Sequence, residues 1–340
     1  MRTRRRLRRI IAVTLAVVVG VPVLAVAGLL VWDGGIDIDP RRELLPGVRL
    51  DLRTADTRLG PVEYDLAGTD GPTVLSVHAG LGGADQGRLF ADWLRAEGYR
   101  VLSPSRPGYL GTPLDSGASL DEQADLLAAL LDELAIDRVG VFAASAGSPV
   151  AYTFAARHPD RVWALVSVGG VSLPKPPRPP ADPVRTAFLN TVGQKLVRLT
   201  ATLSPRTLVS GTLDETSTFT AEQKAARTAY IMDTPDARAF FDAMVDTTFP
   251  YPDRNPGTAN DAEQALTPLP LERISAPTLV VHGTQDGDVP FENGLHAAER
   301  VQGAEHHWMV EDDHLGFWLS PAAGTAHAEV SEFLGRHRRR

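Results

Sequence analysis

VGVFAASAGSPV, residues 139–150, is the stretch that decides the fold of this chain. It runs from apolar residues into small residues around one serine, and then into a helical pattern that reaches Arg157. Ala143 and Gly147 allow a strand and a helix to approach closely, where a larger side chain would clash. The stretch therefore predicts a tight strand–turn–helix that exposes the Ser145 hydroxyl beyond the end of a sheet, near the unpaired N–H groups of a helix N-terminus.

The composition allows a large folded body and excludes several classes of function. The chain has 340 residues, 43% of them hydrophobic, enough for one domain with an insertion or for two domains. It has no cysteine, which excludes disulfides, thiolate metal sites and a cysteine nucleophile. Ten arginines lie near the ends, in residues 2–9 and 336–340, and without them the formal charge is −18 rather than −8. An acidic body argues against nucleic acid as a partner.

The N-terminus has the pattern of a membrane anchor. Residues 1–9 are basic, and residues 10–32 follow as 23 residues without a charge. As a transmembrane helix this span would be about 34 Å long, enough to cross a bilayer. The preceding arginines predict a cytoplasmic N-terminus, so we expect a single-pass protein of the cell membrane with an extracytoplasmic catalytic domain. The alternative is secretion after cleavage of a signal peptide near Ala25-Val26-Ala27.

Beyond a linker at residues 33–47, predicted strands and helices alternate. This alternation is typical of an α/β fold with a mostly parallel sheet covered by helices on both faces. We expect the first two strands to form an antiparallel edge. The expected strands lie at residues 48–51, 62–66, 73–77, 101–102, 138–142, 162–168, 278–282 and 306–310.

The alternation stops after the strand at residues 162–168. Six prolines lie between residues 173 and 183, and residues 185–273 show helical or irregular patterns without a convincing strand. We therefore expect a core made of residues 48–173 and 274–340, with an inserted helical cap at residues 174–273. Ligands of such sheets bind outside the carboxyl ends of the strands, where the cap would lie.

A serine hydroxyl is a poor nucleophile near neutral pH, so it needs a base and an acid that orients the base. Both residue types follow Ser145 in the chain. Asp286 comes just after one predicted strand and His314 just after the last one. Asp288, close to Asp286, is expected to be solvated. His306-His307 is not expected to bind a metal, because adjacent strand residues face opposite ways.

Five pieces stand in order at predicted strand ends: HAGLGG (78–83), RPGY (106–109), AASAG (143–147), HGTQD (282–286) and His314. Through these pieces the chain, from about residue 48 to its C-terminus, resembles the α/β-hydrolase family, whose chain order is also Ser–Asp–His. The resemblance implies Ser145 as nucleophile, His314 as general base and then acid, and Asp286 as orienting carboxylate. It also implies an oxyanion hole formed by the backbone N–H groups of Gly80 and Ala146.

Two places depart from the family's usual pattern. Ala143 stands where the family usually has glycine, and Ala79 and Leu81 stand where it often has glycine and proline. Neither change removes a backbone donor, because a residue other than proline keeps its N–H. Ser145 argues against the members that open epoxides or cleave carbon–halogen bonds, since those use an aspartate nucleophile.

We therefore expect a membrane-anchored serine hydrolase, without cofactor or metal, that cleaves a small-molecule ester or amide through an acyl-serine intermediate. A carboxylic ester is the default substrate. One alternative is a peptidase like the proline iminopeptidases, which share the fold and a cap but usually carry Asp-Gln-Arg-Gly where this chain has Ser105-Arg106-Pro107-Gly108. Another is a catalytically idle binding protein of the same fold, against which an intact triad argues.

Overall fold

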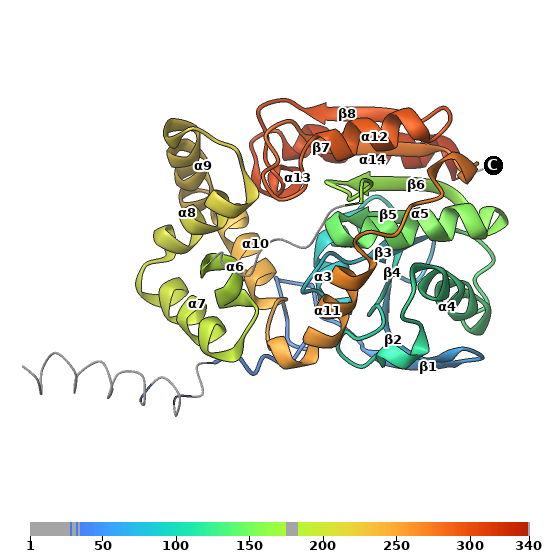
Figure 1. Ribbon diagram of the computed structural model, residues 1–340, viewed down its shortest axis with the longest axis horizontal. Helices are drawn as coiled ribbons and strands as arrows, with labels where there is room; N and C mark the ends of the chain where they lie inside the picture. The colour runs from blue at the N-terminus through green and yellow to red at the C-terminus, as the bar shows by residue number, and fades with distance from the viewer. Residues whose placement is uncertain (1–27, 29–31, 33–34, 175–182, 339–340) are drawn as a thin grey trace, which may run out of the picture.

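The computed structural model describes residues 28, 32, 35–174 and 183–338, and its centre is one eight-stranded sheet (Figure 1). The strand order is β1-β2-β4-β3-β5-β6-β7-β8. The strands are β1 (Arg53–Thr57), β2 (Gly60–Ala67), β3 (Thr73–Val77), β4 (Arg100–Pro104), β5 (Val139–Ala144), β6 (Val162–Val168), β7 (Thr278–Gly283) and β8 (Glu305–Met309). β2 pairs antiparallel with β1 and β4, and all other neighbours pair parallel. The predicted mostly parallel sheet is confirmed.

Helices cover both faces of this sheet. Successive strand side chains point to opposite faces, so Val74 and Phe142 pack in one hydrophobic cluster and their neighbours Leu75 and Val141 in another. The first cluster includes side chains of α3 and α14, and the second includes side chains of α4, α5 and α12. The helices of the core are α3 (Ala84–Ala91), α4 (Leu120–Glu133), α5 (Ser148–Arg157), α12 (Glu292–Arg300), α13 (Gly316–Leu319) and α14 (Ala323–His337).

The first edge strand lies later in the chain than predicted. Val48, Leu50 and Leu52 are buried at every second position, which is the pattern of a strand. Their backbone joins no ladder, however: Val48 makes only an isolated bridge, and the N–H of Asp51 donates to the Asp65 carboxylate (2.7 Å). The alternation therefore reports burial against the core, and the ladder begins only at β1.

Between β6 and β7 the described residues form helices and no strand. The helices are α6 (Pro183–Phe188), α7 (Thr191–Leu203), α8 (Pro205–Thr216), α9 (Ala221–Asp233), α10 (Pro235–Asp246) and α11 (Asn255–Gln264). In Figure 1, α7, α8 and α9 stand as a lobe to the left of the sheet, whereas α11 lies close to the core. We call α6–α11 the cap; its expected boundaries at residues 174 and 273 stay a prediction.

Buried arginines join the cap to the core. Arg254, just before α11, is fully buried, and its guanidinium donates to the Asp85 carboxylate (2.7 Å) and to the carbonyl of Gly82 (2.6 Å). Arg106 of the core in turn donates to Asp261 of α11 (2.6 Å). Both contacts are made near the loop at residues 78–83, so this loop and the cap are held together.

The expected single-pass location in the cell membrane is wrong. No helix in the described ranges is long and apolar enough to cross a bilayer. The residues on which the expectation depended, 1–9 and 10–32, lie outside the described part of the chain except for Gly28 and Trp32.

Replacing Arg254 with Leu should lower the free energy of unfolding by about 3–5 kcal/mol, because Asp85 would keep a buried charge without its partner. The double variant Arg254→Leu/Asp85→Leu should recover part of this loss. As a control, Arg206→Gln breaks an exposed pair with Asp233 (3.6 Å) and should cost less than about 1 kcal/mol. Denaturant unfolding measures all three, and equal losses in Arg254→Leu and Arg206→Gln would contradict the prediction.

Candidate active site

Ser145 lies at the turn between β5 and α5, in a backbone conformation that few residues other than glycine adopt. Its φ is 49°, in the left-handed region, and its side chain is largely covered, with 9% of the residue exposed. Gly147 makes the turn possible, because a Cβ there would lie 2.4 Å from the carbonyl oxygen of His78. The helix therefore packs directly onto the end of β3, and Ser145 is held above the centre of the sheet.

Asp286 and His314 meet at the carboxyl ends of β7 and β8. The Nδ1 of His314 lies 2.7 Å from the Oδ2 of Asp286. The other oxygen of Asp286 accepts the N–H groups of Asp288 (2.9 Å) and Val289 (2.7 Å). His282 adds a further contact, with its Nε2 3.3 Å from Oδ2. The buried carboxylate is thus fixed on both sides, and it orients the imidazole so that Nε2 faces away from it.

The electrostatics of this pair favour an ionised acid and a basic imidazole. Burial lowers the pKa of His314, but the charges of Asp286, Asp288 and Asp313 outweigh it and raise the pKa to about 9. Burial likewise raises the pKa of Asp286, but His314 and His282 outweigh this and bring the pKa down to about 2. Asp286 is therefore a carboxylate at neutral pH, and its charge makes His314 a strong proton acceptor.

The loop after β6 lies between Ser145 and His314. A Cβ at Gly169 would lie 3.1 Å from two ring atoms of His314, and the N–H of Val171 donates to the carbonyl of Ser145 (3.3 Å). Within the described residues, the hydroxyl of Ser145 forms no hydrogen bond to His314. In this class of site such bonds often form only when substrate binds.

Gly80 and Ala146 are neighbours in the fold. A Cβ at Gly80 would lie 3.7 Å from that of Ala146, so the loop at residues 78–83 passes over the turn that carries Ser145. Ala146 is in the first turn of a short 3₁₀ helix (Ser145–Gly147), where N–H groups lack intrahelical partners. The structure thus brings the two expected oxyanion donors to the same place, beside the serine.

His78 braces this loop from within. Its Nδ1 lies 2.8 Å from the carbonyl of Ala79, and its Nε2 accepts the N–H of Arg106 (2.9 Å). Burial, with Arg106 and Arg254 nearby, lowers the pKa of His78 well below its usual value. A neutral imidazole with one donor and one acceptor fits both contacts, so its geometry is that of a structural group.

The sequence reasoning missed a set of cap contacts to the same site. Thr216, the last residue of α8, accepts the N–H groups of both His314 and Gly287 (each 3.1 Å). Arg227 of α9 pairs with Asp312 and Asp313, the two residues before His314. The available signal in the sequence was the adjacent pair Asp312-Asp313, in a loop expected at a strand end. Two adjacent carboxylates that are buried need a counter-charge, which here is Arg227.

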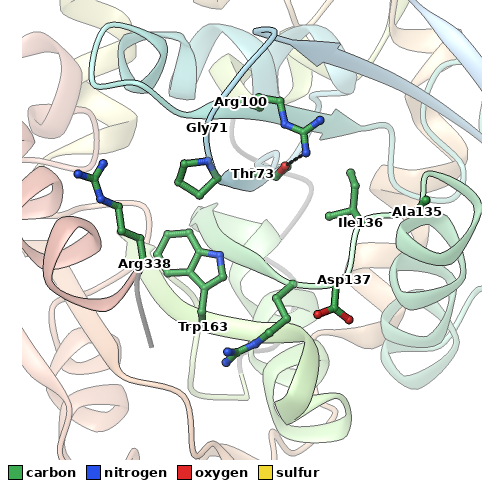
Figure 2. Close-up of a pocket in the computed structure, with 10 residues that line it drawn as sticks. Gly71, Thr73, Arg100, Ala135, Ile136, Asp137, Trp163 and Arg338 are labelled. Carbon is green, nitrogen blue, oxygen red and sulfur yellow. Dashed lines mark hydrogen bonds between the residues drawn. The ribbon is translucent and has the colours of Figure 1, made fainter.

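Two cavities among the described residues lie at opposite ends of the sheet. A small one of about 10 Å³, the size of one water, adjoins His314, Phe317 and Gly169. A larger one of about 320 Å³ is lined by residues such as Arg100, Trp163 and Arg338 (Figure 2). Those residues lie around the amino ends of β3, β4, β5 and β6, so the larger cavity is at the opposite end of the parallel strands from Ser145. In the described ranges no three His, Asp or Glu side chains are grouped to hold a metal ion.

A model of the alpha/beta hydrolase fold family matches residues 72–321. The structure of an alpha/beta hydrolase fold protein from Nakamurella multipartita is 39% identical, covers 85% of this chain and 99% of its own, and superposes with a TM-score of 0.79.

Two relatives are similar at a lower identity. The uncharacterized hydrolase YcgS of Bacillus subtilis is 28% identical over 284 residues, 81% of this chain and 95% of its own. The 2-hydroxy-6-oxononadienedioate/2-hydroxy-6-oxononatrienedioate hydrolase of Klebsiella pneumoniae is 28% identical over 279 residues, 78% of this chain and 87% of its own. Because the family model spans most of the chain and these relatives are hydrolases, the protein is a hydrolase that belongs to the α/β-hydrolase fold family.

Proposed function

We propose that this protein is a serine hydrolase that cleaves a carboxylic ester through an acyl-serine intermediate. The observation that carries the proposal is the 2.7 Å contact between Asp286 and His314, at the strand ends beside a serine held at a φ of 49°. A buried acid, an imidazole and a serine hydroxyl in this order supply an orienting group, a base and a nucleophile.

In the proposed reaction, the Oγ of Ser145 attacks the acyl carbon of the substrate while Nε2 of His314 takes the hydroxyl proton of Ser145. The charge that develops on the acyl oxygen is stabilised by the N–H groups of Gly80 and Ala146. The intermediate collapses, and His314 returns the proton to the departing alcohol. Water then attacks the acyl-serine with His314 again as base, which releases the acid and restores Ser145. Asp286 stays ionised and holds the imidazole throughout.

An ester is favoured over a prolyl peptide by the surroundings of Arg106. The side chain of Arg106 is only 1% exposed, and both ends of its guanidinium donate to Asp261. This arginine is therefore committed to the cap and is not free to bind a peptide terminus. The second candidate, a peptidase, is weakened further because Pro107 stands where the proline iminopeptidases usually carry the arginine of Asp-Gln-Arg-Gly. An idle binding protein has no need for an acid–imidazole pair.

Incubation with a fluorophosphonate should add one adduct, on Ser145, because the probe reacts with a serine that has an activating base. Peptide mass spectrometry locates it. Ser145→Ala should abolish the adduct, and His314→Ala should slow labelling by roughly 10²-fold or more, the usual contribution of a general base. Ser148→Ala, three residues along the same turn, is the matched control and should label like the wild type. Labelling elsewhere, or none in folded protein, would end the serine hydrolase proposal.

The wild-type kcat/KM for a p-nitrophenyl ester should rise with pH, reach half its maximum near pH 9 and level only above it, because the base must be neutral and its pKa is raised to about 9. Asp286→Asn removes the charge that raises this pKa, so the rise should move to lower pH. Its plateau should fall roughly 10⁴-fold, since the imidazole loses the partner that orients it. At each pH, the rate measured with Ser145→Ala is subtracted as the background hydrolysis of the ester. A rise at the same pH in both proteins would show that His314 is not the titrating base.

Three kinds of substrate can then be compared: esters of graded acyl length, prolyl amides, and the 2-hydroxy-6-oxononadienedioate that appears in the name of the Klebsiella relative. Faster turnover of a prolyl amide than of any ester would favour the second candidate. Faster turnover of the dienedioate would place the activity with that relative instead.

A further inference from the structure

A guanidinium of the cap spans the two acids that precede the proposed base. Nη1 of Arg227 lies 2.7 Å from Oδ1 of Asp313, and Nη2 pairs with Oδ1 of Asp312. All three side chains are buried, with 9%, 0% and 5% of Arg227, Asp313 and Asp312 exposed. The guanidinium lies over the ring of Phe219, with Cζ of Arg227 5.3 Å from the centre of the ring. Such a fork between carboxylates fixes geometry as well as charge.

The two acids are packed into the site as well as paired. The carbonyl of Asp312 accepts the N–H of Gln285, the residue before Asp286 (2.8 Å). A Cβ at Gly283, the end of β7, would lie 2.5 Å from that same carbonyl oxygen. A shift of Asp312 would therefore displace two loops together: the loop after β7, which carries Asp286, and the loop after β8, which carries His314.

The charges around His314 are otherwise almost all negative. Asp286 and Asp288 face it from the loop after β7, with Oδ2 of Asp288 3.7 Å from its Nε2, and Asp313 lies on its own loop. His282, from the end of β7, contacts Asp286 and not the imidazole. Among the described residues, Arg227 is a cation that pairs with the two acids beside His314, Asp312 and Asp313. Even beside it, burial raises the pKa of Asp313 to about 6, which shows how costly the charge is there.

We propose that Arg227 is a positioning residue for His314: the cap places its guanidinium on Asp312 and Asp313, and thereby holds the base loop in register and limits the negative charge around the imidazole. The proposal rests on the proposed function of His314 as the base. Its consequence is that docking of the cap completes the catalytic site, although Arg227 itself touches no reacting atom.

The test compares Arg227→Gln and Arg227→Lys with Arg238→Gln, which breaks a cap ion pair with Asp242 (2.7 Å) away from the base. For a p-nitrophenyl ester, Arg227→Gln should lower kcat by about 10²-fold, the cost of a base displaced by about 1 Å, with KM little changed. The rise of kcat/KM with pH should move to higher pH, because uncompensated carboxylates favour the protonated imidazole. Arg227→Lys should recover part of both effects, and Arg238→Gln should show neither.

The double variant Arg227→Gln/Asp313→Asn separates charge from packing. It leaves no uncompensated charge on Asp313, so its pH profile should return toward that of the wild type while kcat stays lowered. It also serves if Arg227→Gln does not fold. A profile that does not move in any Arg227 variant, or losses equal to those of Arg238→Gln, would overturn the proposal.

A second readout does not depend on turnover. The imidazole resonances of His314 are titrated by NMR in Ser145→Ala, with and without Arg227→Gln, and are assigned by their loss in His314→Gln. The pKa of His314 should rise when Arg227 is removed, and an unchanged pKa would overturn the role of Arg227. If the wild type labels no serine and hydrolyses no ester, the proposed function fails, whereas this titration still decides whether Arg227 controls the imidazole.

Discussion

The left-handed backbone of Ser145 is the constraint on which the rest of the site depends. A residue with a Cβ is disfavoured in that region by about 1–2 kcal/mol, so the surrounding structure must hold it there. β5 lies in the middle of the sheet between β3 and β6, and Gly147 allows the following helix to contact the carbonyl of His78. The same close contact brings Gly80 beside Ala146. The turn that carries the hydroxyl thus also brings the two expected oxyanion donors close to each other.

Much of this arrangement could be predicted from the sequence because it depends on local patterns. Parallel strands carry apolar runs, and residues that follow them gather at one edge of the sheet. Asp286 and His314 were placed in that way, 28 residues apart in the chain and 2.7 Å apart in space. The family resemblance was confirmed by the family model and by the matching structures.

The errors have physical causes. Alternating buried residues at 48, 50 and 52 suggested a strand, but alternation reports burial, and a ladder needs a partner backbone that the sequence does not display. Asp288 was expected to be solvated; its side chain is 32% exposed, and its carboxylate also lies 3.7 Å from Nε2 of His314, a contact that the sequence does not display. Arg227 could not be assigned, because its partners are 85 and 86 residues away and nothing in a helical pattern identifies the side that faces the core.

The cap contacts limit how the cap can vary. Thr216 contacts His314 and Gly287, which lie in the loops of the proposed base and of the orienting acid. Arg227 contacts the loop of the base, and Arg254 contacts the loop at residues 78–83. These three positions therefore support the proposed catalytic groups. A buried arginine cannot be removed alone, because the carboxylate that it leaves behind is costly. Under the proposed function, other cap positions can vary with the substrate, while these three keep the geometry of the site. The cap is in this sense part of the catalytic framework, and its helices cannot be exchanged as a module without rebuilding the loops beneath them.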